Sequence, residues 1–147
     1  MATIGKFTVP VNYDDVRWET VNRDRYLFVT HDLRSEDFPI RGQGTAEVVM
    51  TLVVFENESD PQQVLDEIKR LGLRVPDRAE AESFHEKHPA ERTKYPIIAL
   101  SSSVTGHGGQ HVACIYAHWG DLGLYRHLLG HCWGQDCRFL AIHPQSL

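Results

Sequence analysis

The sequence predicts a single α+β domain in which a sheet of about six strands, antiparallel or mixed, carries two or three helices. Two observations lead to this class. Short runs of β-branched and aromatic residues recur along the chain, and segments with helical caps or helical apolar spacing lie between them. The length of 147 residues suits one domain over residues 1–147, and no repeat, low-complexity tract or linker divides it.

The first third of the chain predicts strands and one loop. Residues 7–11 form a strand, residues 16–21 and 26–30 form a hairpin around a polar turn, and residues 32–44 form an exposed loop. The strongest strand covers residues 46–56, where the apolar residues are nearly continuous. Such a strand is typically covered on both faces, so we expect it to be central in the sheet.

Two helices are expected next. Asp60 suits the N-cap, Pro61 suits the first helical position, and Gly72 supplies the end of a helix whose apolar residues follow helical spacing. A second helix runs from Asp77 to about His88, and its many charges predict an exposed element.

The last third predicts three strands and a third helix. Residues 95–102 and 112–118 form buried strands separated by the glycine-rich turn 106–109, and residues 138–143 form the final strand. Asp121 caps a helix that reaches Trp133, with an apolar stripe along one side.

Composition excludes several classes of protein. Apolar residues at 41% and charged residues at 24% indicate a soluble globular protein, and the longest apolar stretch, 48–55, is too short to cross a membrane. A net charge of −5 argues against nucleic-acid binding, which needs clustered Lys and Arg. With no signal peptide at the N-terminus and three cysteines, we expect a cytoplasmic protein with reduced thiols.

Charge is distributed unevenly along the chain. Residues 96–147 contain only two acidic and two basic side chains, yet they hold six of the nine histidines and all three cysteines. So few charges indicate burial, either in the core or in an interface, which motivates a homodimer through this stretch. We expect functional chemistry to lie in the same stretch.

Two histidine pairs suggest a zinc site. His107 and His111 are four residues apart in the turn, and His127 and His131 are four apart on the predicted helix, which would place both rings on one face. The glutamate of the zinc-protease signature is absent between His127 and His131. The alternative is that these histidines pack or form hydrogen bonds within the core.

A cysteine nucleophile is the other catalytic candidate. Cys114 and His118 lie on one strand at a spacing of roughly 13 Å, which excludes a direct hydrogen bond between them. The apolar neighbours of Cys114 favour a structural cysteine.

Aromatic and histidine side chains of the last third are candidates for a ligand pocket or a dimer surface. The expected pocket residues are His107, His111, His118, Trp119, Tyr125 and Trp133. No complete catalytic set is present, so the sequence favours a domain that binds a small molecule or a protein partner. The alternative is a small hydrolase, either metal-dependent or using a Cys–His pair, and no catalytic residue is assigned.

Overall fold

The structure of the protein is a computed structural model. It describes residues 2–19, 26, 28–29, 38, 40, 42–105, 111–119, 121–128 and 132–144. The main chain alone is described for residues 2, 19, 28–29, 101–105, 111 and 126–128.

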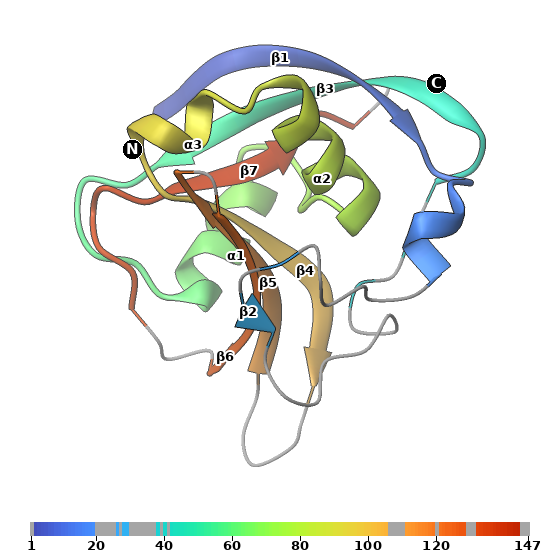
Figure 1. Ribbon diagram of the computed structural model, residues 1–147. Helices are drawn as coiled ribbons and strands as arrows, with labels where there is room; N and C mark the ends of the chain where they lie inside the picture. Colours follow the sequence, from blue (N-terminus) through green and yellow to red (C-terminus); the bar gives the residue numbers. More distant parts are fainter. Residues whose placement is uncertain are drawn as a thin grey trace.

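A mixed sheet of seven strands runs through the described part of the chain, and six of these strands have five residues or more (Figure 1). Their order is β1-β3-β7-β4-β5-β6-β2; the β7–β4 and β6–β2 pairs are parallel and the other pairs antiparallel. The predicted α+β class is therefore confirmed. The strands are β1 (Ala2–Asn12), β2 (Phe28–Val29), β3 (Thr45–Val54), β4 (Ile97–Thr105), β5 (His111–His118), β6 (Asp121–Leu128) and β7 (Arg138–Ile142).

Helices cover both faces of the sheet. The described part contains α1 (Pro61–Arg70), α2 (Arg78–Lys87), the short α3 (Glu91–Lys94) and a 3-10 turn, η1 (Val16–Glu19). Side chains alternate along β4, so Ile97 packs in one apolar cluster with Phe84 of α2, whereas Ile98 packs in another with Ile68 of α1. The two longer helices therefore lie on opposite faces (Figure 1).

The first helix and the long strand agree with the sequence. Asp60 caps α1, Pro61 occupies its first turn, and Gly72 follows it with a φ of 75°. The strand expected at 46–56 is β3, which pairs with β1 on one side and β7 on the other. It is an inner strand with buried residues on both faces, although β4 is the middle strand of the seven.

The predicted N-terminal hairpin is wrong. Residues 16–19 form the η1 turn, and β2 pairs in parallel with β6; residues 20–25 lie outside the described residues. The reason is local polar bonding: the Asp15 carboxylate accepts from the Arg17 backbone N–H at 2.9 Å, and the Trp18 indole donates to the Asn12 carbonyl at 2.8 Å. Side-chain bonds of this kind compete with strand pairing. The loop expected to be exposed at 32–44 also contains a core residue, since Phe38 is only 4% exposed.

The predicted third helix is a strand. Asp121 does not cap a helix but begins β6, which forms a hairpin with β5 in which Tyr116 faces Gly123. Pairing with β5 buries Leu124 and orders the main chain, so tertiary contacts override the helical spacing of the sequence. Trp133, expected at the end of that helix, forms an isolated β-bridge with Ser59.

The second helix exists, but its predicted exposure is wrong. Asp77 caps α2, and every residue from position 78 to 85 is buried. Four of these buried side chains are ionisable: Arg78, Glu80, Glu82 and His85. Glu80 and Glu82 are each bound by an arginine that is near in sequence and by a tyrosine that is distant in sequence, as the next subsection describes.

Candidate functional site

The tip of the β5–β6 hairpin contains a small cavity, here called the aromatic pocket. Its volume is about 200 Å³. Both strands and the turn between them contribute side chains. The lining residues are Tyr116, His118, Trp119, Asp121, Leu122, Gly123 and Tyr125.

The strand register brings these residues together. His118 pairs with Asp121, and Tyr116 pairs with Gly123. A side chain on Gly123 would collide with Tyr125, because a Cβ there would lie 2.5 Å from the Tyr125 ring. The missing side chain lets the Tyr125 ring lie over the main chain and pack edge-on against Tyr116, with 6.0 Å between ring centroids.

Trp119 occupies an unusual backbone conformation at the hairpin turn. Its φ is 59°, in the left-handed region that bulky side chains rarely adopt, and its side chain is 62% exposed. Tight two-residue hairpin turns require this conformation and usually place Asn, Asp or Gly there. The Trp119 backbone N–H donates to the Arg92 carbonyl at 2.7 Å, which joins the turn to α3. An exposed indole is thus retained at a position where glycine would be less strained.

The polar groups that line the pocket include the Tyr116 and Tyr125 hydroxyls and the Asp121 carboxylate. Asp121 lines the pocket and is exposed. Burial raises the pKa of Tyr116, with further contributions from nearby Cys137, Asp136 and Tyr125. The Tyr116 phenol therefore stays protonated at neutral pH and can donate a hydrogen bond.

Three of the six expected pocket residues, His118, Trp119 and Tyr125, line this single cavity. Trp133 does not line it; its ring packs against Phe139, with 5.4 Å between centroids, in the core on the α1 side of the sheet. His107 lies outside the described residues, and only the main chain of His111 is described. The expectation for those two histidines stays a prediction.

The predicted helix that would place His127 and His131 on one face is not present at His127, which lies in a strand. His127 belongs to strand β6, where it pairs with Val112, and His111 pairs with Leu128. The side chains of His111 and His127, and all of His107 and His131, fall outside the description. Among the side chains that are described, no group of three or more His, Cys, Asp and Glu residues could hold a metal ion.

The buried cysteines are poor nucleophiles. Burial raises the pKa of Cys114, and burial together with the Asp136 carboxylate raises the pKa of Cys137 to about 11. Both thiols are protonated at neutral pH, whereas the thiolate is the reactive form. Cys114 lies in the apolar cluster that faces α1.

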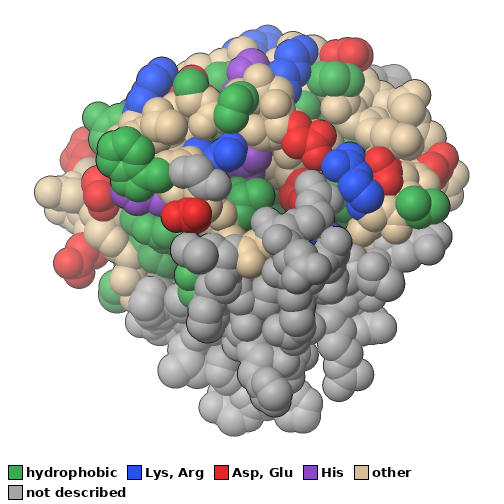
Figure 2. Space-filling model, viewed as in Figure 1, with side chains coloured by type: hydrophobic (Ala, Val, Ile, Leu, Met, Phe, Trp, Pro, Cys, Tyr) green, Lys and Arg blue, Asp and Glu red, His purple; other side chains and the backbone are tan. Residues whose placement is uncertain are grey.

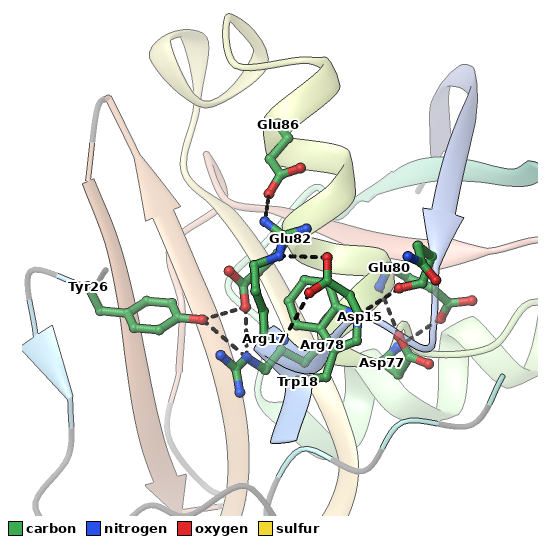
Figure 3. A network of polar contacts seen from close by, with 10 residues as sticks. Asp15, Arg17, Trp18, Tyr26, Asp77, Arg78, Glu80, Glu82 and Glu86 are labelled. Carbon is green, nitrogen blue, oxygen red and sulfur yellow. Dashed lines mark hydrogen bonds and ion pairs between the residues drawn. The ribbon is translucent and has the colours of Figure 1, made fainter. Parts of the chain in front are cut away.

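A buried polar network on α2 is the feature that the sequence reasoning missed (Figure 3). The Arg78 Nε donates to Glu82 at 2.7 Å, and the Tyr26 hydroxyl donates to the same carboxylate at 2.5 Å. The Trp18 ring lies 5.5 Å from the Arg78 guanidinium. Burial and the Glu82 charge raise the pKa of Tyr26, which keeps its hydroxyl protonated as a donor.

A second centre of this network is Glu80. Its carboxylate accepts two hydrogen bonds from the Arg74 guanidinium, at 2.8 and 2.6 Å, and one from the Tyr13 hydroxyl at 2.6 Å. The available sequence signal was the four-residue spacing of Arg78 and Glu82 among alanines and Phe84. That pattern also suits an exposed helix, so it could not reveal the burial.

Comparison with protein-family models, with curated proteins and with solved structures found no match for the chain. No helix in the part of the chain that the structure describes is long and apolar enough to span a membrane.

Proposed function

We propose that the protein is a small-molecule-binding domain and that the aromatic pocket binds a small organic cation. The observation that carries this proposal is the set of three aromatic rings, Tyr116, Trp119 and Tyr125, around one cavity that also has a carboxylate, Asp121. The face of an aromatic ring attracts a cation, and cages of such rings are a common way to bind quaternary ammonium groups.

Pocket size and strain support this reading. A volume of about 200 Å³ suits a small ligand rather than a peptide. Trp119 keeps a left-handed backbone that costs roughly 1–2 kcal/mol for a residue with a side chain. Strained residues of this kind cluster at ligand sites, where the strain has a functional reason.

The hydrolase reading has less support than the binding reading. Cys114 and Cys137 are buried thiols, and the described side chains form no metal-binding group of three or more. The proposed cytoplasmic location rests on the cysteine count, three, an odd and small number that does not suit a disulfide-stabilised secreted protein.

A homodimer through the charge-poor stretch stays a prediction. Strands β4, β5 and β7 bury much of this stretch inside one chain, through residues such as Ile98, Ile115 and Leu140. Burial in the chain's own core already accounts for the low charge. Sedimentation at tens of micromolar protein measures the oligomeric state directly.

Titration with tetramethylammonium and choline tests the proposed ligand class. We expect saturable binding, measured by calorimetry and by the shift of the Trp119 indole N–H signal in NMR spectra. Trp119→Gly removes the ring and relieves the positive φ, so it should weaken binding about tenfold while raising stability by about 1 kcal/mol. Asp121→Asn should weaken binding without this gain in stability.

The matched control is Tyr95→Ala, which removes an exposed aromatic ring that does not line the pocket. Its affinity for both compounds should equal that of the wild type. Absence of saturation with either compound, or equal affinity in Trp119→Gly, would rule out the organic-cation proposal.

A further inference from the structure

A second cavity is lined by residues of α2 and α3 and shares Leu122 with the aromatic pocket. Its volume is about 280 Å³. On the face shown in Figure 2, basic, histidine and acidic side chains adjoin one another over these two helices. The lining residues are Glu82, His85, Glu86, Pro89, Arg92 and Leu122.

His85 is an unpaired polar group in the wall of this cavity. Its side chain is 3% exposed, and neither ring nitrogen has a hydrogen-bond partner. Buried side-chain polar atoms in folded proteins are paired in the large majority of cases, so an exception needs an explanation. Burial and the nearby Arg92 charge lower the pKa of His85 to about 3, so the ring is neutral and offers one donor and one acceptor.

Arg92 supplies an unpaired cation beside this imidazole. Its Nη1 donates to the His85 carbonyl at 3.2 Å, which fixes the guanidinium against α2. Its Nε is buried without a hydrogen-bond partner, and Arg92 has no ion pair in the part of the chain that the structure describes. The bond from the Trp119 N–H to the Arg92 carbonyl holds the main chain in place. A guanidinium edge and a neutral imidazole together form a preorganised site for an oxyanion.

Two carboxylates in the same wall limit which anion fits. Glu82 is bound to Arg78 and Tyr26, and Glu86 is bound to Arg17 at 2.6 Å. A multiply charged anion such as phosphate is repelled by these groups, because like charges at short range are unfavourable. A ligand with a single carboxylate that also carries a hydroxyl or ammonium group donates a hydrogen bond to one of them.

We propose that this cavity binds a small hydroxy or amino monocarboxylic acid, with the carboxylate held by Arg92 and His85 and the donor group facing Glu82 or Glu86. The site is independent of the organic-cation pocket. It assigns a purpose to two buried nitrogen atoms, the Arg92 Nε and the protonated ring nitrogen of His85, that have no partner in the described part of the chain.

Titration of the ¹⁵N-labelled full chain with sodium glycolate tests the proposal. We expect saturable shifts of the Arg92 Nε–H and His85 ring signals, which a merely structural role for these groups would not produce. Sodium acetate, which lacks the hydroxyl, should bind more weakly than glycolate. Inorganic phosphate should bind most weakly of the three.

Arg92→Gln should weaken glycolate binding on the order of tenfold or more, since it removes a charged hydrogen-bond donor. His85→Gln should also weaken it. The control is Arg138→Gln, which removes a guanidinium that lies over Tyr95 and does not line the cavity. If a variant loses its folded NMR spectrum, the wild-type titration still decides the matter.

Three results would overturn the proposal. They are no saturation by glycolate in the wild type, tighter binding of phosphate than of glycolate, and unchanged affinity in a folded Arg92→Gln variant. None of these bears on tetramethylammonium or choline, so failure here and failure of the organic-cation pocket are distinguishable.

Discussion

Helices α1 and α2 are alike in length and in the way they begin, and they differ in their surroundings. Each has ten residues and a complete capping box, formed by Asp60 with Gln63 in α1 and by Asp77 with Glu80 in α2. Helix α1 buries only Pro61 and two aliphatic residues. Helix α2 buries eight consecutive residues.

The difference lies in what packs against each helix. One face of α1 packs on the sheet, and its charged residues face solvent, where Arg70 pairs with Glu67. Helix α2 lies between the sheet and the N-terminal segment, which brings Tyr13, Trp18 and Tyr26 to its charged residues. Burial of a charge is tolerated where partners and hydrogen bonds replace water. The charge content of a helix therefore does not decide its exposure.

The largest difference between the helices should be in the stability lost when an arginine of each is replaced. Arg78 and Glu82 are each 1% exposed, so Arg78→Met leaves a buried carboxylate without its cation, at an expected cost of about 3–5 kcal/mol. Urea unfolding followed by circular dichroism measures this. The same change at Arg70 of α1 should have little measurable effect, because the Arg70 side chain is 66% exposed and water replaces its partner. Equal losses of stability at the two sites would mean that the buried α2 network contributes no more to stability than the surface ion pair of α1.

The second largest effect should be a loss of stability at low pH that comes from His85 of α2. The lowered pKa of His85, about 3, lies below the value near 6.5 of an unfolded histidine, so only the unfolded state binds this proton between these pH values. Stability is thus complete above about pH 6.5 and falls as the pH decreases, by about 2 kcal/mol at pH 5. Urea midpoints at pH 7 and pH 5 measure the fall.

His85→Gln removes the group that takes up this proton. The fall in the free energy of unfolding between pH 7 and pH 5 should therefore be smaller by about 2 kcal/mol than in the wild type. The control, His118→Gln, changes a histidine of the hairpin and leaves His85 in place, so the fall in stability should persist. A wild-type and His85→Gln pair with identical pH dependence would show that His85 accepts a proton in the folded state.

The smallest difference between the helices should be in the stability lost when each N-cap aspartate is removed. Asp60→Ala and Asp77→Ala each remove an acceptor for a backbone N–H, at a cost of about 1 kcal/mol in a typical helix. The loss at Asp77 should be the larger, because its partner, the Glu80 N–H, is buried and cannot bond to water instead. Urea unfolding of both variants compares them. A larger loss at Asp60 would contradict this explanation.

Local chemistry determined what could be predicted from the sequence. The α+β class, the bounds of α1 and the inner strand β3 follow from capping residues, proline and glycine positions and apolar spacing, which act within a few residues. The tip of the aromatic pocket was also foreseeable in part. His118, Trp119 and Tyr125 are close in sequence, and the hairpin keeps them close in space.

Only the tertiary structure decided the rest. Residues 121–128 have an apolar spacing that suits a helix, and pairing with β5 makes them a strand. The charges of α2 suit an exposed helix, and Tyr13, Tyr26 and Arg74, which come from other elements, allow its burial. His85 and Arg92 form a polar cavity because α2 and α3 meet beside β6. In each case the deciding contact joins elements that no local spacing connects, because burial and partner choice depend on the whole fold.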